Sequence, residues 1–223
     1  MIKLLSIADI ITLTNIIFGF MAIVMIFLNE TWFSFSFILL ALLADGLDGI
    51  VARKTRNGEL GEYFEAMADM TSFSIAPSIF VYAIYHGTVS CCIYYHICLI
   101  IVLIVFLSMS VIRLASFHTM KNKNFFIGIP APASTIIIII LALIDIKFLY
   151  ILLAIVVVSI AMVSNVKFPK PGLRMDAFAA ILIILTLIFD KNYDSVVPLV
   201  LLLVLTTYVI AGPVYLWKIK NKA

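Results

Sequence analysis

Residues 37–70, FILLALLADGLDGIVARKTRNGELGEYFEAMADM, form two helical segments joined by a short polar turn, and both segments carry acids. Residues three and four apart share one face of a helix, so Asp45 and Asp48 form one acidic stripe. Glu65 and Asp69 form a second stripe beyond the turn. In an antiparallel hairpin the four carboxylates meet at matching depth, roughly 12–18 Å from the turn at 1.5 Å per residue.

Four facing carboxylates repel one another unless something neutralises them. Oxygen ligands suit hard cations such as Mg²⁺, Mn²⁺ or Ca²⁺, and four carboxylates suffice for a two-metal site that clamps the oxygens of a phosphoryl transfer. Gly49 and Ala52 continue the first stripe and lack bulk, so an extended ligand can lie against the helix there. The alternative is a set of salt bridges to Arg53, Lys54 and Arg56, which lie nearer the turn than the acids.

The composition predicts a membrane protein. Of the 223 residues 65% are hydrophobic and 12% are charged, whereas soluble domains have about half and a quarter. We expect an all-α, polytopic helical bundle forming a single domain over 1–223, with a catalytic hairpin at about 33–85. Because a charge inside the bilayer costs at least about 2.5 kcal/mol, the four acids at membrane depth indicate a functional site.

A bilayer crossing needs roughly 20 apolar residues. Eight spans are predicted, at about residues 8–28, 33–53, 59–85, 91–116, 129–144, 148–165, 174–189 and 194–216. The two spans between 129 and 165 are short, so the alternative is six or seven spans with one of these segments re-entrant.

Basic residues set the orientation, because lysine and arginine accumulate in cytoplasmic loops. With both termini in the cytoplasm, 13 of the 15 basic residues lie inside, and only Lys147 and Lys191 lie outside. We therefore expect a protein of the cytoplasmic membrane whose active site opens to the cytoplasm. The net charge of +3 then reflects topology, and no basic groove predicts a nucleic-acid partner. Three cysteines lack metal-ligand spacing and are interpreted as packing residues.

Seven residues of the hairpin follow one another in a fixed order: Asp45, Asp48, Gly49, Ala52, Arg53, Gly61 and Asp69. This order resembles the motif of the CDP-alcohol phosphatidyltransferase family. Two features depart from it. The third acid is Glu65 where the family has aspartate, and the seven-residue spacer between Arg53 and Gly61 is one residue short. We hypothesise that the extra methylene of Glu65 restores the reach that a shorter turn removes.

Four further segments are similar to the serine-using branch of that family, the phosphatidylserine and archaetidylserine synthases. They are Ser72–Pro77, Arg113–Phe117, Phe126–Ala133 and Ser164–Pro169, and the resemblance covers roughly residues 10–175. It implies transfer of a phosphatidyl or archaetidyl group from a CDP-linked lipid to L-serine, with release of CMP. Family members are often homodimers, so a homodimer is expected here.

The resemblance also implies residue roles. Asp45, Asp48, Glu65 and Asp69 would hold divalent metal, Mg²⁺ or Mn²⁺ and two ions, with Asp69 also serving as catalytic base. CDP would be bound by Asn15, Asp45, Gly49, Ala52, Arg53 and Gly61. For Asn15, the alternative is that it is only a residue of the helix start and binds no nucleotide.

The acceptor would be met by Ser72 and Ser74, by Arg113 for the serine carboxylate, and by Lys121 and Lys123 in a loop that closes over the site. Positive-inside anchoring is the alternative for the three bases. Glycerol phosphate or inositol phosphate is the alternative acceptor, although the few arginines favour a small zwitterion. A cation transporter is the alternative of another class, but the chain has no second acidic hairpin that would indicate an internal repeat.

Overall fold

The computed structural model describes residues 6–52, 61–90, 92–119, 125–170, 172–189 and 196–220. The chain divides into two compact units, Met1–Leu107 and Ser108–Ala223, whose boundary falls inside one long helix, α5 (Ile93–Thr119).

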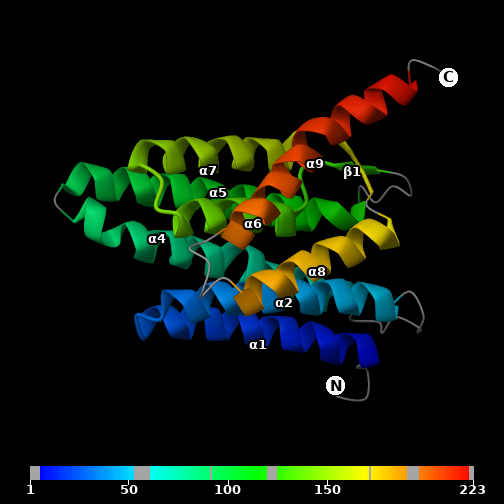
Figure 1. Cartoon of the computed structure of the whole chain (residues 1–223), viewed down its shortest axis with the longest axis horizontal. Helices are drawn as coiled ribbons and strands as arrows, with labels where there is room; N and C mark the ends of the chain where they lie inside the picture. Colours follow the sequence, from blue (N-terminus) through cyan, green and yellow to red (C-terminus); the bar gives the residue numbers. More distant parts are fainter. Residues whose placement is uncertain are drawn as a thin grey trace. The chain divides into compact units, whose positions relative to one another are not determined.

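The first unit is built on a helical pair, α1 (Ile7–Phe27) and α2 (Thr31–Ala52), which lie side by side (Figure 1). Ser6 and Asp9 start α1 with a reciprocal capping box, in which each side chain bonds the backbone N–H of the other residue. Asn29 makes the turn between the helices with a positive φ of 59°. The chain therefore returns along α1 after only a few residues.

The return arm of the acidic hairpin is one long helical stretch with a local change of winding. It consists of α3 (Gly61–Met70), a π-helix (Thr71–Ile75) and α4 (Ala76–Val89). All three parts pack against α1. Single π-helical turns occur frequently at functional sites, and this one begins two residues after Asp69.

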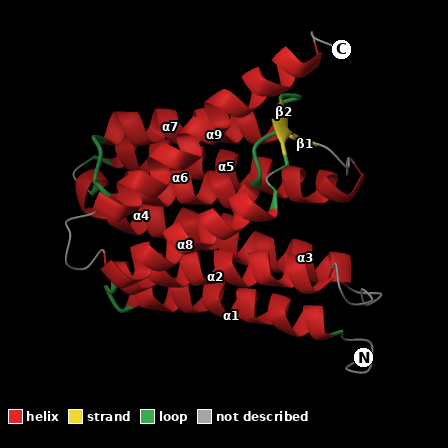
Figure 2. Cartoon of the chain, turned by 45° about the vertical axis from the view of Figure 1, so that its right-hand side comes forward, coloured by secondary structure: helices red, strands yellow, loops and turns green. Residues whose placement is uncertain are grey.

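The second unit contains two short strands that were not predicted, β1 (Phe125–Ile127) and β2 (Lys167–Pro169). They pair antiparallel, with Phe126 opposite Phe168 (Figure 2). Gly128 follows β1 with a φ of +74°, and a Cβ there would overlap the carbonyl oxygen of Met162. The pair thus joins two of the segments that resemble the serine-using branch.

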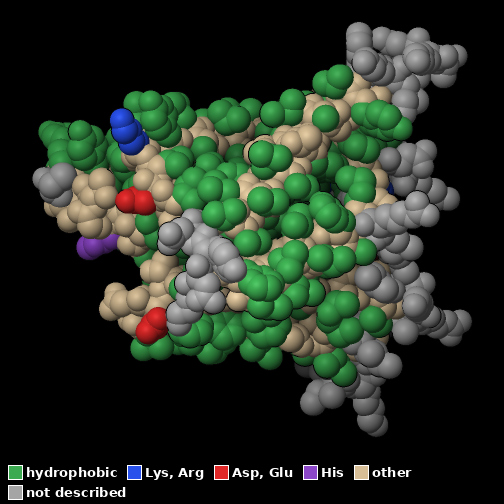
Figure 3. Space-filling view, viewed as in Figure 1, with side chains coloured by type: hydrophobic (Ala, Val, Ile, Leu, Met, Phe, Trp, Pro, Cys, Tyr) green, Lys and Arg blue, Asp and Glu red, His purple; other side chains and the backbone are tan. Residues whose placement is uncertain are grey.

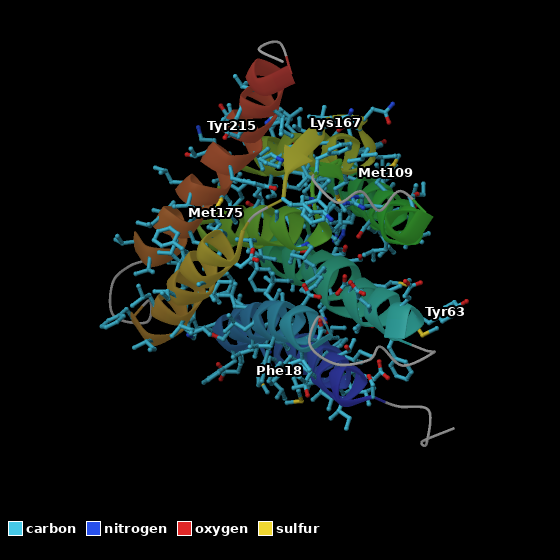
Figure 4. The ribbon with its side chains drawn as sticks, turned by 90° about the vertical axis from the view of Figure 1, so that its right-hand side faces the viewer. Phe18, Tyr63, Met109, Lys167, Met175 and Tyr215 are labelled. Atoms are coloured by element: carbon cyan, nitrogen blue, oxygen red, sulfur yellow. The ribbon has the colours of Figure 1, made fainter. Side chains whose placement is uncertain are left out.

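Four helices complete the second unit: α6 (Ala131–Leu143), α7 (Phe148–Val163), α8 (Leu173–Phe189) and α9 (Val196–Lys220). Buried isoleucines of α6 and α7 supply much of its core. The hydroxyl of Tyr208 on α9 donates to the carbonyl of Pro169 at 2.8 Å, which holds α9 against β2. Lys167 on β2 is labelled in Figure 4, and its ammonium group lies 4.6 Å from the centre of the Phe125 ring.

The helices have the length and surface of a membrane protein. Five described stretches are long and apolar enough to cross a bilayer: Asp9–Phe27, Thr31–Gly49, Gly61–Val89, Ile93–Ser116 and Val196–Leu216. Apolar side chains cover most of the face in Figure 3. The all-α membrane fold is confirmed, apart from the strand pair. Helices lie at all eight predicted spans, but α6, α7 and α8 are shorter than a full crossing, so the count of eight stays a prediction.

Candidate active site

The two arms of the hairpin bring their four acids together. The carboxyl groups of Asp45 and Asp69 are in hydrogen-bonding contact, and both lie close enough to Asp48 and Glu65 for electrostatic repulsion. Asp48 and Asp69 are buried, and Asp45 and Glu65 are half-buried. On α3, the helix of Glu65 and Asp69, Tyr63 is exposed and projects outward (Figure 4). The acids therefore occupy the packed side of α3 and the facing side of α2.

The chemistry of this cluster fits a divalent cation. Two carboxyl groups in hydrogen-bonding contact need a proton or a cation between them, and among the described residues no lysine or arginine is found to act on Asp45, Asp48 or Asp69. Oxygen-only donors are those that Mg²⁺ and Mn²⁺ prefer. Within the described ranges, no three acidic, histidine or cysteine side chains surround one point as ligands of a bound ion do. The acids are thus neighbours, not a closed coordination sphere.

Helix α1 adds a row of small and polar residues that faces this cluster. Asp9, Thr12, Asn15 and Gly19 recur every three or four residues, and all four are buried. The Thr12 hydroxyl donates to Oδ2 of Asp48 at 2.7 Å. The Asn15 amide donates to Oδ1 of Asp69 at 3.4 Å. We call these four residues the α1 row.

Asp9 lies at the start of this row. It is only 2% exposed, and it is near enough to Asp48 to act on it electrostatically. Its Oδ1 atom lies 3.4 Å from the position that a Cβ of Gly61 would take. A Cβ at Gly61 would thus make an ordinary van der Waals contact with Asp9, and the start of α3 lies beside the start of α1.

The end of the row fixes α1 against the π-helix. A Cβ at Gly19 would overlap the hydroxyl of Ser72 and lie 2.9 Å from its Cα. The same hydroxyl donates to the backbone carbonyl of Asn15 at 2.9 Å. The structure therefore uses Ser72, predicted to meet the acceptor, in a helix-to-helix contact. Ser74 is fully buried in the same turn.

The sequence interpretation missed Thr12 and the burial of Asp9. Thr12 stands inside an apolar span, where one hydroxyl is unremarkable by itself. The signal was its spacing, because Asp9, Thr12 and Asn15 follow one another at three residues and so share a helix face.

The α2 face beside the acids is open where a nucleotide site was predicted. No described atom lies within 4 Å of the position of a Cβ at Gly49. Gly46 is equally open, so among the described residues it makes no close helix contact. Ala52 ends α2, and Arg53 lies outside the described residues. The open glycine positions leave room for a ligand next to Asp45 and Asp48.

Of the basic residues predicted to meet the acceptor, the structure describes one. Arg113 lies on the part of α5 that belongs to the second unit, and it is 8% exposed. Its Nε donates to the carbonyl of Ile129 at 3.3 Å, just beyond Gly128 and the end of β1. Lys121 and Lys123 lie outside the described residues.

The chain is similar to known proteins over most of its length. Residues 5–163 match the family model of the CDP-alcohol phosphatidyltransferases. A CDP-diacylglycerol–serine O-phosphatidyltransferase of Methanocaldococcus jannaschii is 30% identical over 169 residues, 75% of this chain and 76% of the relative. One of Helicobacter pylori is 31% identical over 175 residues, 71% of this chain and 70% of the relative.

An archaetidylserine synthase of Methanothermobacter thermautotrophicus is also similar, at 30% identity over 82 residues, or 35% of each chain. The matched region includes both arms of the acidic hairpin, the α1 row and the segments around Arg113 and Gly128. The chain is a member of the CDP-alcohol phosphatidyltransferase family.

Proposed function

We propose that this protein transfers the phosphatidyl or archaetidyl group of a CDP-linked lipid to the hydroxyl of L-serine and releases CMP. The observation that carries this proposal is the meeting of Asp45, Asp48, Glu65 and Asp69 beside the open face of Gly49. The relatives named serine O-phosphatidyltransferase support serine as the acceptor.

The four acids are the residues that would hold divalent metal, Mg²⁺ or Mn²⁺ and two ions. When bound, the metal neutralises the charge of the pyrophosphate and of the departing phosphate. The acids themselves bring oxygen donors from both helices of the hairpin to one depth. Removing any one of them would leave the metal with fewer oxygen donors.

Nucleotide binding falls to the open side of α2 and to α1. Gly49 and Gly61 carry no side chain that would occupy the site, and Ala52 and Arg53 continue the same stripe of the family motif. Oδ1 of Asn15 is buried and has no hydrogen-bond partner among the described residues, while its amide faces Asp69. That oxygen is therefore suited to accept a hydrogen bond from the bound nucleotide.

Asp69 is the proposed general base. It takes the proton of the serine hydroxyl while the serine oxygen bonds to the phosphorus that carries the lipid. The bond between this phosphorus and the CMP oxygen breaks, and the electron pair leaves with CMP. Burial of Asp69 among helices α1, α2 and α3 excludes bulk water from the attack.

The acceptor is held through its own charges. The Arg113 guanidinium matches the serine carboxylate, because arginine offers paired N–H donors. Ser72, Ser74, Lys121 and Lys123 complete the proposed acceptor side. We place the protein in the cytoplasmic membrane with the site open to the cytoplasm, because basic residues are predicted on the side of the hairpin turn. The homodimer rests on the family resemblance.

The test is release of CMP by purified protein from a CDP-linked lipid with Mn²⁺ or Mg²⁺. Serine, glycerol phosphate and inositol phosphate are offered separately, and a reaction without acceptor is the control. We expect acceptor-dependent CMP release with serine. Release with only one of the two phosphates would reassign the acceptor, and no release with any of them would contradict the proposed reaction.

A further inference from the structure

We infer that Thr12 is a positioning residue that orients Asp48 for cation binding, with Asn15 doing the same for Asp69. This inference rests on the proposed function, but it concerns helix α1, outside the acidic hairpin. One carboxylate on each arm of the hairpin receives a hydrogen bond from α1. The two donors are three residues apart and thus on one helix face.

The contact between Thr12 and Asp48 is short and buried. The hydroxyl lies 2.7 Å from Oδ2, and the two residues are 5% and 7% exposed. Threonine is branched at Cβ and has few accessible χ1 rotamers in a helix. The donor is therefore held in place by α1 itself, and water has little access to replace it.

Each bond is made to one oxygen of its carboxylate, and the Asp48 carboxylate also accepts a hydrogen bond from the backbone of Gly49. Oδ2 of Asp48 accepts from Thr12, and Oδ1 of Asp69 accepts from Asn15. A donor to an ionised carboxylate favours the ionised form and fixes its plane. Second-layer partners of this kind typically change metal affinity or activity about 10–100-fold when they are removed.

The height of the donors along the hairpin is fixed by the far end of the α1 row. Gly19 admits Ser72 to close contact, and the Ser72 hydroxyl donates to the backbone of Asn15. Sliding of α1 along α3 would break this contact. The contact between Gly19 and Ser72 thus keeps Asn15 level with Asp69.

The experiment compares Thr12→Val, which removes the hydroxyl at nearly constant shape, with Thr12→Ser, which retains it. Thr14→Val is the matched control, because the Thr14 hydroxyl donates to the carbonyl of Ile10 in its own helix. Direct Mn²⁺ binding is measured by electron paramagnetic resonance with CDP present. Thermal unfolding, the Mn²⁺ concentration for half-maximal CMP release and the KM for the CDP-linked lipid are measured on the same samples.

We expect Thr12→Val to weaken Mn²⁺ binding about 10–100-fold and to raise the Mn²⁺ requirement by a similar factor, while the unfolding temperature stays near that of the wild type. Thr12→Ser should restore most of the affinity, and Thr14→Val should match the wild type. If Thr12→Val does not fold, Thr12→Ala serves, since it also removes the hydroxyl.

Unchanged Mn²⁺ affinity in a folded Thr12→Val or Thr12→Ala protein overturns the inference, as does a Thr12→Ser protein no better than Thr12→Val. The outcomes separate the inference from the proposed function. If Mn²⁺ binding depends on the Thr12 hydroxyl but the wild type releases no CMP, only the proposed reaction is contradicted. If the wild type releases CMP and Thr12→Val needs no more Mn²⁺ than the wild type, only the positioning role of Thr12 is contradicted.

Discussion

Asn15 contacts the return arm of the acidic hairpin through its side-chain nitrogen and through its backbone carbonyl. Its nitrogen faces Asp69, its backbone carbonyl accepts from Ser72, and its side-chain oxygen is buried without a partner among the described residues. A buried acceptor left unsatisfied costs about 1–3 kcal/mol. This cost is recovered when a ligand donates to it, so the residue favours the occupied site.

Asp69→Asn tests the proposed base. The asparagine retains an oxygen that can accept from Asn15, but it cannot take a proton from serine. We expect CDP binding to persist, measured as thermal stabilisation by CDP with Mn²⁺, while CMP release falls by about 10²–10⁴-fold, the usual contribution of a general base. Wild-type turnover would contradict the assignment, and so would a variant whose only defect is loss of folding.

Glu65→Asp tests whether the longer acid compensates for the short turn. Removing one methylene should pull the carboxylate back by about 1 Å, a misplacement that can cost about 10²-fold in rate. We expect a higher Mn²⁺ requirement and slower CMP release in Glu65→Asp. Glu62→Asp, at an exposed position of the same helix, is the control. Full activity and unaltered metal affinity in Glu65→Asp would show the compensation idea to be wrong.

At the scale of elements, close packing of α1 on the π-helix depends on one missing side chain. Gly19→Ala should lower stability by about 1–3 kcal/mol, the usual cost of overpacking, because the new methyl group overlaps Ser72. Gly46→Ala is the matched control, since no described atom lies within 4 Å of its Cβ position. Thermal unfolding in detergent distinguishes them, and equal unfolding temperatures would refute the tight contact.

The helices were predictable because long apolar runs mark the membrane spans and basic residues mark the loops between them. The start of α1 and the end of α7 agree with the predicted spans to within two residues. The strand pair was not predictable, because three residues show no strand period and the pairing of Phe126 with Phe168 is a long-range contact. The π-helix was missed for a similar reason, since Thr71–Ile75 looks locally like any helical turn.

The meeting of the four acids could be foreseen because helical spacing and a short turn determine it. The hydrogen bonds from α1 could not, because the sequence does not state which helix packs against the hairpin. Only the structure assigns Thr12 to Asp48. For Ser72 the sequence suggested an acceptor contact, and the structure adds a contact with α1 that residue type alone does not indicate.

At the scale of the whole molecule, charge asymmetry predicts which ends of the helices face the cytoplasm. Within the described residues the short connection between α6 and α7 contains Lys147, one of the two basic residues predicted to lie outside. This connection is thus the most informative position, because it tests the two short helices as well as the orientation. A re-entrant segment would place it on the other side or within the bilayer.

Cysteine accessibility measures this topology. In a background where Cys91, Cys92 and Cys98 are replaced by serine, we expect Lys147→Cys to react with a membrane-impermeant maleimide in intact cells. Asn57→Cys and Asn221→Cys should react only after permeabilisation. Labelling of Asn57→Cys in intact cells would contradict the predicted orientation. Protection of Lys147→Cys would contradict the prediction that α6 and α7 each cross the membrane.

The α1 row also bears on how the molecule is assembled in the membrane. Ribosomes release α1 before the acidic hairpin, so Thr12 and Asn15 are already present when Asp48 and Asp69 enter the lipid. Each unpaired charge at that stage costs at least about 2.5 kcal/mol. Hydrogen bonds from Thr12 and Asn15 lower the free-energy barrier to insertion of the acidic helices. The first helix made would then act as a template for insertion of the second and third.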